Sequence, residues 1–303
     1  FPYTTLFRSV IRPSFSRRRT LSLLSSLGAD AVLLQDLGLV KICREEFPEL
    51  PTLIYDGPFS ESMASPAPVF LAGMDEVDET EARAAAARFL SAREEDVIFQ
   101  GECGGEIPCR VYNAFLGGDE YTVYVTDRGG CVLSALSSRL PGRAKLSTAE
   151  ALGEAENFLL QQHIPDMTES YHMIQGGVMT VNYEYEQDGV ICYPDLIKIG
   201  ISMDNGAVVS YDARGYLSCH KQRDLPAPEI EERAAREQVS PALKLEKSRL
   251  ALIPSPGGEE RLCYEFSGLA EDGGRFLIYV NAVTGAQEKI LILLEDESGT
   301  LTI

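Results

Sequence analysis

Residues 192–217, CYPDLIKIGISMDNGAVVSYDARGYL, contain the pattern that decides the fold. From Ile197 to Met203 every second side chain is apolar, and this period of two is typical of a half-buried β-strand. Asp204-Asn205-Gly206 follows at once, and Asn and Gly accept the positive φ angles of a tight turn. The stretch therefore predicts two antiparallel strands joined by a turn that closes on glycine.

The same ending occurs three times along the chain. Strand-like segments run into turns that close on Gly130, Gly206 and Gly285, which are 76 and 79 residues apart. Self-similarity at a near-constant spacing indicates repeated structural units. The sequence therefore predicts three small units of similar size rather than one large domain.

Each unit also begins alike. Asp78-Glu79-Thr80-Glu81 and Ser147-Thr148-Ala149-Glu150 have the form of helix capping boxes, and apolar residues follow both with helical spacing. A weaker helix opens at Pro226-Ala227-Pro228-Glu229 and ends before Pro241; its apolar positions are Ile230, Ala234 and Val239. We therefore predict an α+β fold of three tandem units, each with one helix packed on an antiparallel sheet of about four strands.

Units of this build resemble the PepSY modules of the YpeB family of spore germination proteins. The resemblance rests on residues 192–217 and on PTLIYDGPFS (51–60), RLALIP (249–254), LCYEFSG (262–268) and IYVNAVTGAQEKIL (278–291). It extends from near Glu45 to the end of the chain, and it is looser in the first unit than in the other two.

The resemblance implies a function that the residues alone do not. Members of the family are membrane-anchored proteins of endospore-forming Firmicutes and are not enzymes. They work with the spore cortex-lytic enzyme, a peptidoglycan lytic transglycosylase. The module region is expected to stabilise, localise and inhibit that hydrolase until germination, on the extracytoplasmic, cortex-facing side of the spore inner membrane.

The first residues of the chain differ in kind from the rest. Residues 1–9 match the one-frame translation of a common sequencing adapter, and we interpret them as an adapter-derived scar. We interpret residues 10–73 as the remnant of an N-terminal helical region and linker, because leucines in 20–47 have helical spacing. The three modules are expected at 74–143, 144–224 and 225–303. On this interpretation the natural N-terminus and its membrane anchor are missing.

Composition and motifs exclude several classes of function. The formal charge is −19, whereas nucleic-acid binders concentrate positive charge. The seven cysteines and three histidines show no zinc-ligand spacing, and no nucleophile elbow or phosphate loop occurs. We therefore expect no catalytic site, no metal and no cofactor. Cys103 and Cys109 either pair across a hairpin or, as the favoured alternative, remain separate thiols.

An inhibitor needs a contact surface, and aromatic anchors usually carry the binding energy. The candidates for contact with a partner are Tyr55, Phe59 and Tyr193, the last in a predicted loop with Pro194-Asp195; packing in the core or in a turn is the alternative.

Basic residues at 139–143 and 221–223 indicate exposed linkers open to proteolysis. A second hypothesis is a peptidoglycan-binding or envelope scaffold module without inhibitory activity, and a third is an unrecognised hydrolase.

Overall fold

The computed structural model describes residues 32–34, 52–54, 68–255, 259–270, 274–296 and 299–302. The chain divides into two units, Phe1–Ser60 and Glu61–Ile303. In the first unit, β1 (Val32–Leu34) pairs in parallel with β2 (Thr52–Ile54). The helical segment predicted over 20–47 is therefore wrong at 32–34, where β-branched Val32 and a partner strand favour extended backbone. The rest of that prediction lies outside the described residues.

In the second unit, two helices begin at the predicted capping boxes. α3 (Glu79–Leu90) follows Asp78, whose carboxylate accepts a 2.9 Å hydrogen bond from the Glu81 amide. α4 (Thr148–Gln161) follows Ser147, whose hydroxyl accepts from the Glu150 amide at 3.3 Å. The buried faces of the two helices carry Ala82, Ala85, Ala86, Ala87, Phe89, Ala151, Ala155 and Leu159. Local sequence thus decides where these helices begin and which face they bury.

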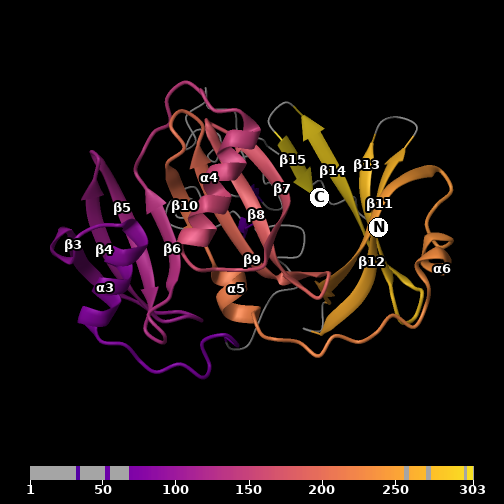
Figure 1. Ribbon diagram of the computed structural model, residues 1–303, viewed down its shortest axis with the longest axis horizontal. Coiled ribbons are helices and arrows are strands. Elements are labelled where there is room, and N and C mark those ends of the chain that lie inside the picture. Colours follow the sequence, from indigo (N-terminus) through magenta and orange to yellow (C-terminus); the bar gives the residue numbers. More distant parts are fainter. Residues whose placement is uncertain are drawn as a thin grey trace. The chain divides into compact units, whose positions relative to one another are not determined.

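Four antiparallel strands follow each of these helices. The first set, after the short 3-10 helix η2 (Glu94–Asp96), is β3 (Val97–Cys103), β4 (Cys109–Leu116), β5 (Asp119–Thr126) and β6 (Val132–Ser137). The second set is β7 (Met167–Gln175), β8 (Val178–Gln187), β9 (Val190–Ser202) and β10 (Val208–Asp212). α3 packs on the first set and α4 on β8 and β9 (Figure 1).

The two sets are not separate sheets, which corrects the expectation of one sheet per unit. β6 pairs antiparallel with β10, with Leu136 opposite Ser210, so a continuous sheet runs from β3 to β7. The last strand of each set thereby satisfies backbone groups that would otherwise form an open edge of the other. The short helix α5 (Arg214–Cys219), which the sequence did not predict, follows β10 and packs on β9.

The third set differs most from expectation. Its strands are β11 (Leu243–Pro254), β12 (Glu260–Ala270), β13 (Arg275–Asn281), β14 (Gln287–Asp296) and β15 (Gly299–Thr302). The predicted helix is reduced to the five residues of α6 (Glu232–Arg236), which has no side-chain cap. Ala235 and Val239 are buried, whereas the predicted core residue Ala234 is exposed. Prolines ahead of α6 and Pro241 behind it limit the length of the helix.

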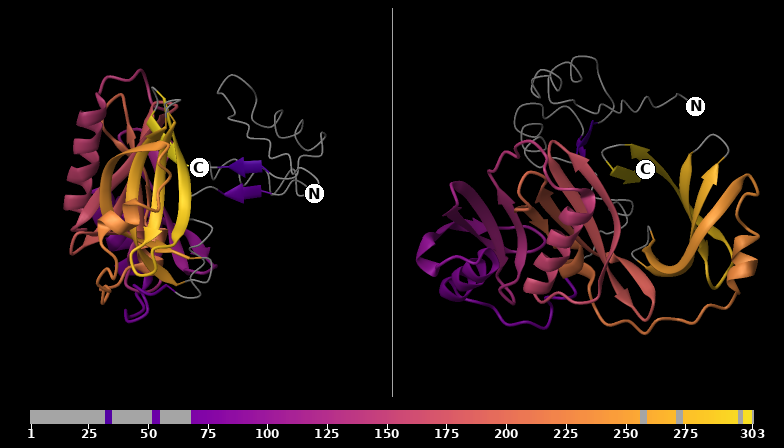
Figure 2. Two further views of the ribbon diagram at one scale, coloured as in Figure 1. Left: turned by 90° about the vertical axis from the view of Figure 1, so that its right-hand side faces the viewer. Right: turned by 45° about the horizontal axis from the view of Figure 1, so that its top comes forward.

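β9 joins the second and third sets. Its residues 190–192 pair with β8 on one side and in parallel with residues 250–252 of β11 on the other, whereas residues 196–202 pair with β8 and, in part, with β10. β15 pairs with β7 at Gly299 and Met173. Strands β7–β9 and β11–β15 therefore form a closed ring, which Figures 1 and 2 show beside α4. The apolar core divides accordingly into one cluster under α3 and α4 and another between α6 and β11–β13.

The predicted module boundaries at residues 143 and 224 fall in connecting segments, but strand pairing continues across both, and the boundaries stay predictions. In the described part of the chain, none of the helices has the length and apolar character needed to cross a membrane.

A glycine in α5 tests how closely this helix approaches β9. A Cβ atom at Gly215 would lie 2.9 Å from the Leu196 carbonyl oxygen, a backbone atom that cannot move aside cheaply. Gly215→Ala is therefore expected to lower the free energy of unfolding by about 1–3 kcal/mol in urea denaturation. Gly153→Ala in α4 is the control: nothing lies within 4 Å of its Cβ position, and the change should raise stability by roughly 0.5–1 kcal/mol. Equal effects of the two changes would contradict the close packing of α5.

Candidate functional site

The predicted contact residue Tyr193 lies inside the protein. The pairing of β8 with β9 skips residues 193–195, which bulge out of the ladder at the junction with the third set. The Tyr193 side chain is 4% exposed, so it contacts this chain's own third set of strands rather than the surface. Tyr55 and Phe59 lie outside the described residues, and their role in partner binding stays a prediction.

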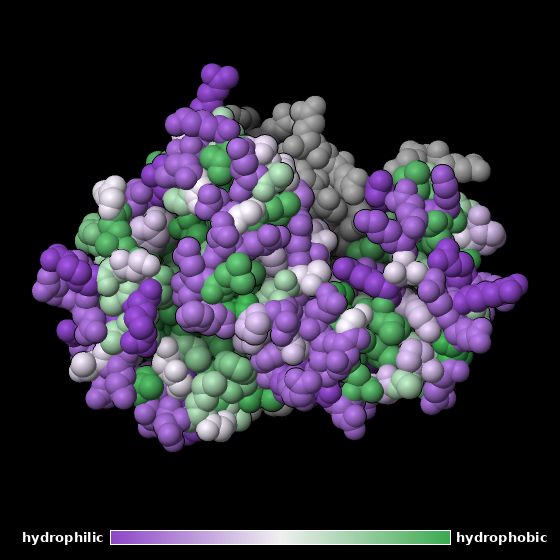
Figure 3. All heavy atoms as spheres, viewed as in Figure 1, coloured by the Kyte–Doolittle hydropathy of each residue, from purple (hydrophilic) through white to green (hydrophobic). Residues whose placement is uncertain are grey.

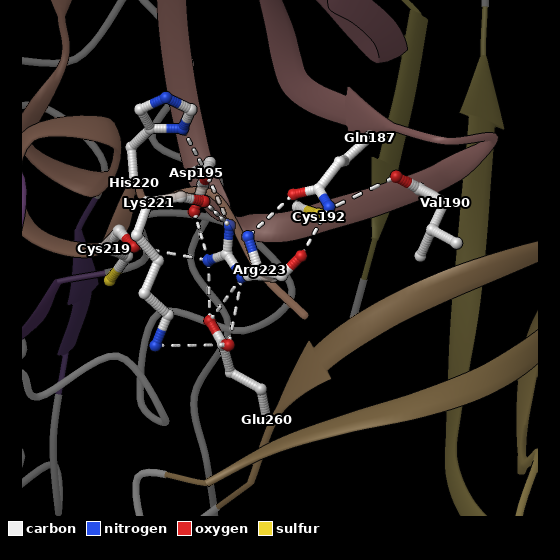
Figure 4. Close-up of polar contacts among 9 residues, drawn as sticks. All are labelled: Gln187, Val190, Cys192, Asp195, Cys219, His220, Lys221, Arg223 and Glu260. Atoms are coloured by element: carbon white, nitrogen blue, oxygen red, sulfur yellow. Dashed lines mark hydrogen bonds and ion pairs between the residues drawn. The ribbon is translucent and has the colours of Figure 1, made fainter. Parts of the chain in front are cut away.

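The same bulge positions Asp195 in a buried ionic cluster, which we call the Arg223 cluster. Asp195 has no exposed surface, and it accepts hydrogen bonds from Arg223 Nη1 at 2.8 Å and Nη2 at 2.6 Å. The other side of the same guanidinium donates to Glu260 at the start of β12, from Nε at 3.0 Å and from Nη2 at 2.6 Å. One arginine thus joins the second set of strands to the third through two paired contacts (Figure 4).

The backbone of Arg223 is held as firmly as its side chain. The Gln187 side chain accepts from the Arg223 amide at 3.0 Å and donates to its carbonyl at 2.7 Å. Lys221 Nζ lies 3.7 Å from Glu260, on the exposed side of the cluster. Burial acts to lower the pKa of Arg223, but the Asp195 and Glu260 carboxylates outweigh it and raise the pKa above its ordinary value. The prediction of an exposed linker at 221–223 is therefore wrong at Arg223, which is 8% exposed.

His220 extends the cluster into a group of aromatic rings. Its Nδ1 lies 2.7 Å from Asp195 Oδ2, and its ring stacks on Tyr216 of α5 with centroids 4.1 Å apart. Tyr185 of β8 and Phe70 contact the ring at centroid distances of 4.5 and 5.4 Å. The chain ahead of α3, the end of α5 and β8 therefore meet at this histidine.

A second polar cluster, the Glu265 cluster, lies on the strands of the closed ring. Arg249 of β11 donates to Glu265 of β12 at 2.7 Å, and Tyr193 donates to the other carboxylate oxygen at 2.5 Å. Arg249 also donates to the Tyr193 hydroxyl at 3.0 Å. Glu184 of β8 belongs to the same environment and accepts a 2.8 Å hydrogen bond from Ser170 of β7.

Burial acts strongly on the Glu184 carboxyl group. Burial is the largest influence on Glu184, and it raises the pKa of this carboxyl to about 8. Glu265 instead faces Arg249, whose guanidinium pairs with it. A carboxyl group with a raised pKa is a feature of many sites of acid–base catalysis. However, Glu184 is 1% and Glu265 is 5% exposed, so a polymeric substrate does not reach them. Their arrangement suits a structural role.

An open cleft of about 450 Å³ lies where the first two sets of strands meet. Its lining includes Phe89 of α3, Phe158 of α4 and Tyr121 of β5, with the Phe89 and Phe158 rings 5.4 Å apart. At its edge Arg139 donates to Asp119 at 3.1 Å and to Asp204 at 2.9 Å. The cleft therefore combines an apolar floor with polar groups.

Polar and apolar residues both occur on the surface of the molecule. On the face shown in Figure 3, polar residues cover most of the area, and apolar residues occur in small separate groups. Within the part of the chain that the structure describes, no group of three or more His, Cys, Asp or Glu side chains could hold a metal ion.

Sequence reasoning missed the Arg223 cluster. The sequence pattern placed Arg223 in an exposed linker and gave no sign that Glu260 lies beside it. The partners of Arg223 lie 28 and 37 residues away along the chain, and no local pattern connects them. The one available signal was the Tyr-Pro-Asp step at 193–195, which interrupts a run of apolar alternation inside β9.

Comparisons with known proteins agree on one family. The family model described as "YpeB sporulation, PepSY1 and PepSY2 domains" matches residues 38–226. A protein named "Sporulation protein YpeB" from Halalkalibacterium halodurans is 30% identical over 225 residues, which is 73% of this chain and 50% of that protein. The protein of the same name from Oceanobacillus iheyensis is 29% identical over 71% of this chain and 48% of its own.

A third relative of that name, from Bacillus subtilis, is 31% identical over 55% of this chain and 37% of its own. The solved "Bacillus megaterium YpeB C-terminal domain" superposes with a TM-score of 0.65 at 26% identity, covering 73% of this chain and 99% of that structure. The sheet-dominated α+β fold with few helices is therefore shared with that structure. The chain spans about half the length of the first two curated relatives.

Proposed function

The chain belongs to the YpeB family of sporulation proteins, and on that premise we propose that it is a non-catalytic regulator of a spore cortex-lytic enzyme. It binds the hydrolase, stabilises and localises it, and inhibits it until germination, on the cortex side of the spore inner membrane. We interpret the fold as three tandem PepSY-like modules, the third with a reduced helix.

The observation that carries the proposal is the Arg223 cluster. A binding partner gains affinity when the surface it meets is already in place, because no loop or domain must be ordered on binding. Asp195, Arg223 and Glu260 fix the third set of strands against the second through buried, bidentate contacts. Such a junction suits a protein that presents a preformed surface to its partner. The burial of Glu184 and Glu265 away from any large substrate suits a protein that performs no hydrolysis.

The proposal is tested with the purified chain, the cognate cortex-lytic enzyme and isolated cortex peptidoglycan. We expect release of soluble fragments by the hydrolase to slow severalfold as the chain approaches an equimolar ratio, and the hydrolase to survive heating longer in its presence. Arg233→Ala, which alters an exposed arginine of α6, should leave both effects unchanged. No change in either the rate or the survival of the hydrolase over a wide range of ratios would refute the proposal.

The cleft supports an alternative, a peptidoglycan-binding or envelope scaffold module without inhibitory activity. Aromatic rings with polar groups beside them are suited to sugars and short peptides, and Phe89, Phe158 and Tyr121 with Arg139 have that composition. The acidic charge of the chain opposes binding to an anionic wall. Sedimentation with purified cortex in the absence of hydrolase, weakened by Tyr121→Ala, would favour this alternative.

A further inference from the structure

Two cysteines lie opposite each other at the free end of the β3–β4 hairpin. Cys103 of β3 is the direct register partner of Cys109 of β4, so both side chains are on the same face of the sheet. The Cys103 thiol lies 3.5 Å from the Gly104 carbonyl oxygen, at the point where β3 ends. Both thiols are free. The sequence left open whether this pair forms a bond, and the register favours it.

We propose that Cys103 and Cys109 form a reversible modification site, at which a small-molecule disulfide of the glutathione class converts the two thiols into a cross-strand disulfide. None of the other described cysteines is the register partner of a cysteine: Cys192 lies opposite Tyr185 and Leu252, and Cys263 lies opposite Ala251 and Asn281. Among the cysteines that the structure describes, the modification is therefore expected at this pair alone.

The edge position of β3 makes the bond geometrically accessible. Directly opposite Cβ atoms in an antiparallel pair are about 4.5–5.5 Å apart, whereas a disulfide needs about 3.5–4.5 Å. A strand held on both sides resists that approach. In the sheet of the described residues β3 is a terminal strand that pairs with β4 alone, and its end leads into Gly104-Gly105, where a Cβ would meet nothing within 4 Å. β3 is therefore free to move by the small distance required.

Exposure decides the order of the two steps. Cys103 is half-buried, and Cys109 is 1% exposed. The Cys103 thiolate attacks one sulfur of oxidised glutathione, which forms a mixed disulfide and releases one glutathione thiolate. The Cys109 thiolate then attacks the Cys103 sulfur and releases the second glutathione. Two protein thiols are oxidised, and one glutathione disulfide is reduced to two thiols.

The second step should respond to pH. Burial is the main cause that raises the pKa of the Cys109 thiol, and it still acts when Cys103 carries glutathione. The reactive thiolate is therefore scarce at neutral pH, and its amount grows tenfold with each unit of pH below the pKa of the thiol. Conversion of the mixed disulfide to the cross-strand disulfide is expected to accelerate steeply between pH 7 and pH 9.

The experiment uses the whole chain and oxidised glutathione as the probe, with acid quenching, alkylation and mass spectrometry. Both cysteines fall in one tryptic peptide, residues 94–110, because Arg93 and Arg110 flank them. We expect this peptide to lose two hydrogen atoms, and the other cysteines that the structure describes to be alkylated. With Cys109→Ser, a glutathione adduct should accumulate on Cys103.

A comparison with the unfolded chain separates a prearranged pair from mere closeness in sequence. At a fixed ratio of oxidised to reduced glutathione, the ratio of disulfide to dithiol in the chain should be at least tenfold higher in buffer than in urea. The proposal would be overturned if the native chain kept both thiols reduced under conditions that oxidise the urea-unfolded chain. It would also be overturned if wild-type Cys103 retained its glutathione adduct. A ratio equal to that in urea would do the same.

Discussion

Arg223→Ala is expected to lower the free energy of unfolding by about 3–5 kcal/mol, the cost of removing one partner from a buried ion pair. The change leaves the Asp195 carboxylate, which has no exposed surface, with the His220 ring as its remaining neighbour in the cluster. It also removes the guanidinium that joins Asp195 to Glu260. We therefore expect the third set of strands to detach more readily, which urea denaturation of the whole chain would detect.

Arg233→Ala is the matched control. Arg233 lies in α6 with its side chain 87% exposed and its Nε 3.7 Å from Glu237, and exposed pairs of this kind contribute little. Its loss should change the free energy of unfolding by less than about 0.5 kcal/mol. Arg223→Lys should fall between the two, because an ammonium keeps the charge and cannot make both bidentate contacts. If the two alanine variants were equally stable, the Arg223 cluster would not hold the junction.

Glu184→Gln is expected to become more stable than the wild-type chain as the pH rises. The folded state holds the Glu184 proton up to a pKa of about 8, whereas the unfolded state releases it near the ordinary value of 4.5. Wild-type stability therefore falls between these two values, by about 1.4 kcal/mol for each unit of pH. Glutamine does not titrate, and its amide oxygen still accepts from Ser170.

Urea denaturation at pH 5 and at pH 8 measures this effect. The difference between Glu184→Gln and wild type should grow in favour of the variant by on the order of 3 kcal/mol between the two values. Glu186→Gln is the control, because Glu186 lies two residues farther along β8 and is exposed. Its stability should follow that of the wild type at both values. A constant difference between Glu184→Gln and wild type would show that Glu184 is ionised inside the protein.

The sequence predicted the features that neighbouring residues control. Asp78 with Glu81 and Ser147 with Glu150 determine where α3 and α4 begin, and both capping boxes are present. Gly206 and its counterparts in the other two turns have positive φ angles, as the turn pattern requires. The third helix was predicted too long because a weak apolar pattern between prolines does not outweigh the missing cap.

The tertiary structure alone decided the rest. Asp195 and Glu260 become ion-pair partners of Arg223 only because β9 pairs with both β8 and β11. Cys103 lies opposite Cys109 because of the register of β3 on β4. Capping and turn formation depend on atoms a few residues apart, so a single sequence reveals them. Burial of a charge depends on which distant strands exclude water around it, and among 27 basic and 46 acidic residues no local pattern identifies the pairs that packing will bury.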